Sequence, residues 1–143
     1  MLIGLNEKLC DKYGRVEKGR HLMRYCKFCM ELKDENDSYC PICGKNQDAE
    51  TPLHHLAVGT ILNRKFLVGA ALGEGGFGIT YIGRDTMLDM KVAIKEYYPV
   101  GYVNRSNTIS QSLSCITGSD RKDFFEKGLE RFLQEANPGQ ILP

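Results

Sequence analysis

The chain has 143 residues, the size of one ordinary domain or of a small module joined to a short domain. Its 19 basic and 18 acidic residues leave a net charge of +1, so no global field would attract nucleic acid or an anionic membrane. No apolar run approaches the roughly 18 residues of a membrane span, and the N-terminus is too quickly charged for a secretory signal. The sequence therefore predicts a globular protein of the cytoplasm with no membrane segment in this chain.

Composition divides the sequence into successive segments with different expected structures. We expect a poorly ordered N-terminal extension at residues 1–22, a zinc ribbon at 23–45 and a polar linker at 46–58. A domain of strands and one helix at residues 59–136 and a short tail at 137–143 follow. The adjacent His54 and His55 fall in the linker, where histidines are more often solvated than bound to metal, so they are left out of the predicted site. The expected fold class is α+β.

The ribbon segment contains two C-x-x-C pairs, Cys26 with Cys29 and Cys40 with Cys43. Each pair can form a tight turn that directs two thiolates at one point, and two such turns supply the four ligands of a tetrahedral zinc. Two disulfides or four free thiols are the alternatives. Glycine directly after the second pair favours zinc, because it tolerates the sharp return of the chain.

This segment resembles the short zinc ribbons at the front of many bacterial multidomain proteins. The resemblance implies a structural Zn²⁺ without specifying a role. Acidic and basic side chains balance across the ribbon and form no basic stripe, so we expect a structural role or the docking of a protein partner in place of nucleic-acid binding.

From residue 59 the pattern changes to strands and turns. We expect an antiparallel meander with a glycine-rich hairpin at one tip, its strands being residues 66–72, 79–83 and 91–96. The following segment is rich in Tyr, Ser and Asn, and there Tyr102-Val103 could pair with Thr108-Ile109.

The hairpin glycines have the spacing G-x-G-x-x-G, at Gly73, Gly75 and Gly78. Such glycines let the backbone close tightly over a polyphosphate, and Lys95, one hairpin later, could reach the phosphate oxygens. A Rossmann unit uses the same spacing and wants an acidic residue about 20 positions later, which Glu96 could imitate. That unit requires a helix directly after the glycines, whereas the segment that follows here has the pattern of a strand.

Residues 59–136 resemble the N-terminal lobe of a eukaryotic-like bacterial Ser/Thr protein kinase. The resemblance depends on the glycine-rich loop at residues 72–80, on Val-Ala-Ile-Lys at residues 92–95 and on a later acidic helix at residues 120–136. It implies a transferase that binds ATP under the glycine flap and transfers a phosphoryl group to Ser or Thr. A glycine-rich hairpin with a surface lysine is the alternative.

The resemblance also implies roles for individual residues. Phe77 would cap the tip of the flap, and Lys95 would bind the α and β phosphates. Leu72 and Ala93 would line the adenine pocket, with Thr80 at a position where the family usually has valine. The implied ATP-binding residues are Leu72, Gly73, Gly75, Phe77, Gly78, Thr80, Ala93 and Lys95.

The helix has the clearest period in the chain, with an apolar stripe formed by Phe125, Leu129, Phe132, Leu133 and Ala136. Gly128 should weaken it by about 1 kcal/mol relative to alanine. In the kinase family this helix is αC, whose glutamate pairs with the strand lysine, so the resemblance implies Glu135 as the partner of Lys95. Glu130 and Glu126 are the alternatives if the register differs, and an ordinary amphipathic helix with Glu135 in water is the other interpretation.

The sequence lacks the motifs that carry out phosphoryl transfer. It contains no His-Arg-Asp and no Asp-Phe-Gly, so the groups that would orient the substrate and hold Mg²⁺ are missing. We expect no catalytic residue in this chain, weak ATP binding, no kinase activity alone, and Mg²⁺ binding only together with a C-terminal lobe. The chain would then be a fragment or a truncated product. The alternative is a non-catalytic zinc-ribbon interaction module with a vestigial nucleotide site.

Overall fold

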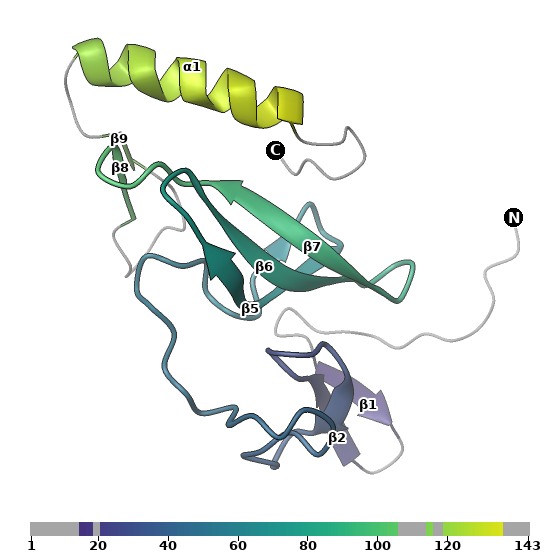
Figure 1. Cartoon of the computed structure of the whole chain (residues 1–143). Coiled ribbons are helices and arrows are strands. Elements are labelled where there is room, and N and C mark those ends of the chain that lie inside the picture. The colour runs from purple at the N-terminus through teal and green to yellow at the C-terminus, as the bar shows by residue number, and fades with distance from the viewer. Residues whose placement is uncertain (1–14, 19–20, 106–113, 116–118, 136–143) are drawn as a thin grey trace, which may run out of the picture.

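The computed structural model describes residues 15–18, 21–105, 114–115 and 119–135 (Figure 1). These residues form a three-stranded sheet, a four-stranded sheet, a two-stranded ribbon and one helix. The elements are β1 (Arg15–Lys18), β2 (His21–Tyr25), β3 (Leu32–Asp34), β4 (Ile61–Leu62), β5 (Phe66–Glu74), β6 (Gly78–Asp85), β7 (Met90–Tyr97), β8 (Val103–Asn104), β9 (Ser114–Cys115) and α1 (Ser119–Glu135). Antiparallel strands with one helix agree with the expected mixed class.

The three-stranded sheet belongs to the cysteine-rich part of the chain and has the antiparallel order β1-β2-β3. Strand β1 pairs with β2, so this sheet begins upstream of residue 23, within the segment predicted to be a poorly ordered extension. For residues 1–14 and 19–20 that prediction lies outside the described residues. Lys33 is buried in β3, where its ammonium donates to the carbonyls of Asp34 and Asp37 and so closes the loop between the cysteine pairs.

Strands β5, β6 and β7 form the predicted antiparallel meander, and β4 adds an edge strand that the sequence pattern did not predict. Thr80 lies opposite Lys95, and Ile82 lies opposite Ala93. Opposed residues share a face and successive residues alternate between faces, so Thr80, Ala93 and Lys95 lie on one side, here called the open face.

The other side of the meander, here called the core face, carries the hydrophobic core. Its buried cluster consists of Leu56, Val68, Ile79, Tyr81, Ile94, Tyr98 and Val103. Leu56 comes from the segment before β4, whereas Tyr98 and Val103 come from the segment after β7. Chain segments on both sides of the meander in sequence therefore cover the same face.

Helix α1 lies beside the end of β7 (Figure 1), and its contacts centre on one tyrosine. The Tyr97 ring packs against Phe125 and Phe132, with centroids 5.1 and 5.4 Å away, and its hydroxyl donates to the Phe125 carbonyl at 3.1 Å. A Cβ at Gly128 would lie 2.1 Å from the Tyr97 hydroxyl oxygen. The glycine that was expected to weaken the helix therefore leaves the space that the Tyr97 phenol occupies.

The predicted apolar stripe of α1 is only partly covered. Phe125, Leu129 and Phe132 are half-buried, Leu133 is exposed, and Ala136 lies outside the described residues. Nowhere in the described residues does a helix combine the length and apolar character needed to cross a membrane.

Strand β8 pairs differently from the prediction. Val103 pairs with Cys115 and Asn104 with Ser114, so the proposed partner Thr108-Ile109 is wrong for Val103; residues 108 and 109 lie outside the described residues. The sequence pattern favoured the shortest turn, whereas the observed pairing closes a longer loop.

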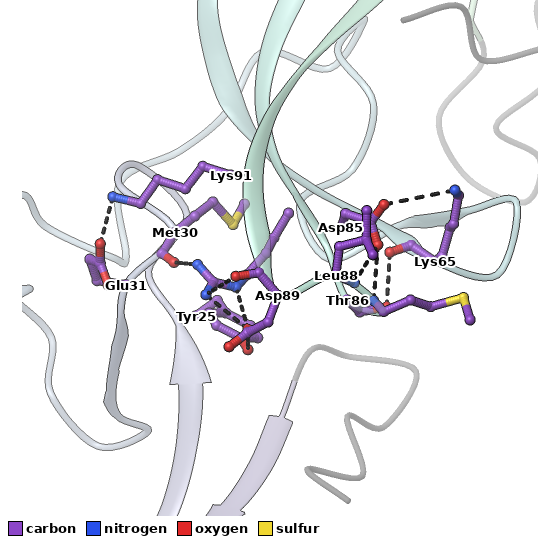
Figure 2. A network of polar contacts seen from close by, with 11 residues as sticks. Tyr25, Met30, Glu31, Lys65, Asp85, Thr86, Leu88, Asp89 and Lys91 are labelled. Carbon is purple, nitrogen blue, oxygen red and sulfur yellow. Dashed lines mark hydrogen bonds and ion pairs between the residues drawn. The ribbon is translucent and has the colours of Figure 1, made fainter. Parts of the chain in front are cut away.

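The cysteine-rich unit and the meander are joined by polar contacts (Figure 2). The guanidinium of Arg84 on β6 donates to the Met30 carbonyl at 2.8 Å and pairs with Asp89 at 2.8 Å. Lys91 on β7 pairs with Glu31 at 2.6 Å. The first cysteine turn therefore lies directly against strands β6 and β7.

Close packing at Gly69 completes this contact. The Ala70 amide donates to the Lys27 carbonyl at 2.7 Å, and Met30 is buried beside Gly69. A Cβ at Gly69 would lie 2.3 Å from the Met30 methyl carbon and 2.6 Å from the Lys27 carbonyl oxygen. Ile82 Cγ2 would lie 2.9 Å away as well, and only glycine allows this approach because one of the three obstructing atoms belongs to the backbone.

We expect Gly69→Ala to separate the cysteine-rich unit from the meander and to lower the free energy of unfolding by about 1–3 kcal/mol, the usual cost of overpacking. Urea unfolding measures the loss, and hydrogen exchange at the Ala70 amide should become faster. Gly76→Ala is the matched control, because nothing lies within 4 Å of a Cβ there. Unchanged protection of the Ala70 amide would contradict the packing argument.

Asp85 at the end of β6 supports a pH-dependent prediction. Its buried carboxylate accepts hydrogen bonds from the amides of Leu88 and Met87, both at 3.0 Å, and lies 3.7 Å from the Lys65 ammonium. The Leu88 amide first, then that of Met87 and the charge of Lys65, hold the pKa of Asp85 below its usual value. The carboxylate should therefore stabilise the β6–β7 turn wherever it is ionised.

Asp85→Ala should cost about 1–3 kcal/mol at pH 7, the usual cost of leaving buried donors unsatisfied. A lowered folded pKa means that the contribution is fully present above the unfolded pKa of about 3.9 and is lost as the pH falls through the folded value. Urea unfolding at pH 7 and in steps below about pH 4 should thus show a shrinking difference between wild type and variant. The exposed Asp123→Ala serves as the control, and a difference independent of pH would refute a role for the charge.

Candidate functional site

The four cysteine thiols of the C-x-x-C pairs converge as the sequence predicted. The Sγ atoms of Cys26 and Cys43 lie 3.7 Å apart, as do those of Cys29 and Cys40, and all four lie within 4.8 Å of one another. A disulfide would need about 2.05 Å, whereas four sulfurs about 2.3 Å from a tetrahedral zinc lie about 3.8 Å apart. The cluster therefore fits a metal ion such as Zn²⁺ and excludes disulfides between these pairs.

Two equivalent turns build the cluster. The amide of Met30 donates to the Cys26 carbonyl at 2.9 Å, and that of Gly44 to the Cys40 carbonyl at 2.8 Å. The residue after each pair has a left-handed φ, 73° at Gly44 and 56° at Met30. Glycine meets this requirement without strain, as predicted for the second pair, whereas the first pair uses a methionine whose side chain packs on the meander.

Neighbouring groups support the cluster as a metal centre. Gln47 is buried and donates to the Cys26 sulfur at 3.3 Å while its side-chain oxygen accepts from the Lys27 amide at 3.1 Å. Burial, with contributions from the neighbouring thiols, raises the pKa of Cys29 to about 12, whereas the amides of Cys43 and Ile42 act against burial and the pKa of Cys40 is lowered to about 7. Four thiolates at this spacing would thus need a cation to balance their charge, which is what a bound metal supplies.

The glycine hairpin is the second candidate site, and its backbone is tied to the segment after β7. The Gly75 amide donates to the Gly78 carbonyl at 2.9 Å and closes the hairpin. The amides of Tyr98 and Val100 donate to the carbonyls of Phe77 and Gly76 at 3.0 and 3.1 Å. The Tyr-Pro-Val sequence after β7 therefore holds the hairpin tip, a function that its composition did not reveal.

Three of the implied nucleotide-binding residues share one face of the meander. Thr80, Ala93 and Lys95 share the open face, and Ala93 and Lys95 are exposed there. Leu72 and Phe77 on the hairpin are exposed by 62% and 61%. The Phe77 ring stacks on Phe124 of α1 with centroids 6.5 Å apart, so the hairpin tip meets the helix.

The three motif glycines have different surroundings. A Cβ at Gly78 would lie 2.6 Å from the Glu96 carbonyl oxygen, so Gly78 is required by the pairing of β6 with β7. At Gly73 and Gly75 no atom lies within 4 Å of such a Cβ. The same is true of Gly76, so of the glycines in this hairpin the packing of the protein requires only Gly78.

The implied pairing of Lys95 with Glu135 stays a prediction. Glu135 ends α1, but its side chain lies outside the described residues. Of the two alternatives, Glu126 lies 3.9 Å from Lys122 on the exposed side of the helix, and Glu130 is exposed.

A buried ion pair lies on the core face behind this site. Arg105, only 1% exposed, pairs with Glu96, and the Tyr81 hydroxyl donates to the same carboxylate at 2.8 Å. Arg105 also donates to the His54 carbonyl at 2.8 Å. The sequence suggested for Glu96 only the acidic residue of a Rossmann unit. The segment around Arg105 has no periodic pattern, so the sequence did not predict a role for Arg105.

Of the two linker histidines, which were expected to be solvated, His54 has a side chain 39% exposed whereas His55 is largely buried. His54 Nε2 lies 2.7 Å from one oxygen of Glu74 and His55 Nε2 lies 2.9 Å from the other. The His55 side chain is 10% exposed. The hydrogen bonds from His55 and then His54 hold the pKa of Glu74 below its usual value. Because Glu74 is distant in sequence, no local pattern could have predicted this contact.

Comparison with known proteins identifies a similar solved structure. No protein-family model and no curated protein matches the sequence. A solved structure described as "PpkA-294 apo form" matches with 34% identity and a TM-score of 0.51, over 60% of this chain and 32% of that chain. This chain thus spans about a third of that structure. The likeness supports a kinase-like fold.

We expect zinc removal to unfold the cysteine-rich unit and to destabilise the meander through the shared contacts at Met30. Zinc-finger peptides gain about 10–16 kcal/mol from the metal at pH 7, so a chelator should lower the urea midpoint of the whole chain markedly. Replacing zinc by Co²⁺ should give thiolate-to-cobalt charge-transfer absorption, which Cys40→Ser should weaken. Cys10→Ser, outside both pairs, is the control; full absorption in Cys40→Ser would show that this sulfur is not a ligand.

Proposed function

We propose that this chain is the ATP-binding part of a Ser/Thr protein kinase, in which residues 59–136 form most of the N-terminal lobe and a four-cysteine zinc ribbon in residues 23–45 packs against it. The main observation behind the proposal is that Lys95 on β7 lies opposite Thr80 on β6, the strand that follows the glycine hairpin, so both residues face the open side of the meander. The likeness to the solved kinase supports it.

The chemistry of this face suits a nucleoside triphosphate. The Lys95 ammonium can pair with phosphate oxygens, and the open surroundings of Gly73 and Gly75 let the backbone approach a polyphosphate. Exposed Leu72 and Ala93 offer apolar surface on which an adenine ring would be removed from water. The sequence holds no aspartate motif for transfer or Mg²⁺ binding, so the activity assigned to these residues is nucleotide binding.

A second candidate function is protein docking through the ribbon. The first cysteine turn is packed on the meander, but the second exposes Tyr39 by 63% and Ile42 by 62%. Exposed aromatic and aliphatic side chains on a rigid metal-bound turn suit a protein partner. A module of this kind would need no working nucleotide site, so nucleotide binding separates the two functions.

We expect a fluorescent ATP analogue to bind the full chain and Lys95→Met to weaken binding by about 10-fold or more. A charge-assisted hydrogen bond contributes about 1.5–3 kcal/mol, and about 1.4 kcal/mol corresponds to a tenfold change. Fluorescence titration measures the change. Lys122→Met removes an exposed lysine of α1 and is the control. Equal affinity of wild type and Lys95→Met would remove the nucleotide function and favour the docking module.

A further inference from the structure

We propose that His54, His55 and Glu74 form a second transition-metal site, separate from the four cysteines. The three side chains each offer one ligand atom, and these atoms lie within 4.8 Å of one another. Two imidazoles with one carboxylate is a donor set used for zinc, and imidazole also suits cobalt, nickel and copper. With three protein ligands, the fourth position would be open to water.

The distances between the donors suit a small rearrangement around a cation. The imidazole nitrogens of His54 and His55 lie 2.7 and 2.9 Å from the two carboxylate oxygens of Glu74. Ligands about 2.0–2.1 Å from a tetrahedral metal lie about 3.3 Å apart, so each nitrogen and its carboxylate oxygen would need to separate by only about half an ångström. Both rings present Nε2 to the same carboxylate, and coordination would require each Nε2 to be free of its proton, with the ring hydrogen on Nδ1.

Buried groups hold the backbone on both sides of His55. Arg105 donates to the His54 carbonyl at 2.8 Å, and the Leu56 amide donates to the Tyr81 hydroxyl at 3.0 Å. Because Arg105 and Tyr81 are both buried, the histidine backbone cannot move freely. A site with a fixed backbone loses little conformational entropy when it binds a metal.

Ring contacts restrict the two imidazoles as well. The His55 ring meets the Tyr81 ring edge to face, with centroids 5.9 Å apart, and the His54 ring lies 5.6 Å from that of Tyr98. A hydrogen-bonded cluster without metal is the competing explanation. It would gain little from its charges, because the His54 and Glu74 side chains are 39% and 34% exposed to water.

The site lies on the side of the hairpin away from the nucleotide-binding residues. Glu74 pairs in register with Ile79 on the core face, whereas Thr80 and Lys95 lie on the open face. A metal held there would join the linker to the end of β5 without occupying the space proposed for ATP. The site therefore does not depend on the proposed function, and its test needs no nucleotide.

The test uses the full chain with its cysteine cluster loaded with zinc, titrated with CoCl₂. We expect one further Co²⁺ per chain, with d–d absorption but no thiolate charge transfer. Its affinity should fall by at least about 10-fold in His55→Ala and in Glu74→Gln. Glu74→Gln changes a partly exposed side chain and keeps a hydrogen-bond acceptor, so it tests coordination even if His55→Ala fails to fold.

His21→Ala removes the remaining histidine of the chain and is the matched control, which should bind Co²⁺ like wild type. Absence of the further Co²⁺, or unchanged affinity in Glu74→Gln, would show a hydrogen-bonded cluster only and overturn the proposal. Charge-transfer absorption in place of d–d bands alone would place the cobalt at the cysteines and would overturn it equally.

Discussion

The buried ion pair between Glu96 and Arg105 joins parts of the chain that are distant in sequence. Removing two charges from water costs several kcal/mol for each ion, so such a pair needs further hydrogen bonds that offset this cost. Tyr81 supplies one to the carboxylate, and the His54 carbonyl accepts one from the guanidinium, whose buried Nε has no partner among the described residues. Loss of either partner would leave a buried charge, at a cost of about 3–5 kcal/mol. Strand β7, the segment before β8 and the linker are therefore fixed together.

Among the residues that join the four-cysteine cluster to the meander, Met30 makes both a polar and an apolar contact. Met30 has a left-handed φ, which costs about 1–2 kcal/mol for a residue with a side chain, and metal binding by the adjacent thiolates can offset this strain. The result is a methionine whose carbonyl accepts from Arg84 and whose methyl group packs beside Gly69. The strained turn thus places both a polar and an apolar contact on the sheet. A cysteine-rich unit attached in this way helps to stabilise the meander.

Local patterns in the sequence predicted the elements that local physics determines. Alternating apolar residues located the three strands of the meander to within about two residues at each end, and cysteine spacing located the four thiols. The pairs of Glu96 with Arg105, Glu74 with the histidines, and Met30 with Gly69 were not predictable. Each joins residues that only the completed fold brings together, and none belongs to a periodic pattern. Gly128 could not be explained from sequence either. Helix propensity predicts only that it weakens α1, whereas the structure shows that a side chain there would collide with the Tyr97 hydroxyl.

The glycine hairpin shows how one motif can satisfy two different constraints. Gly78 lies against the Glu96 carbonyl, so a side chain there would disturb the pairing of β6 with β7 whether or not a ligand is bound. Gly73 and Gly75 face open space, so a side chain there would be tolerated by the fold and would obstruct only a ligand. The open surroundings of two of them are therefore a feature of this hairpin that packing leaves unexplained, and the nucleotide binding proposed above would account for it.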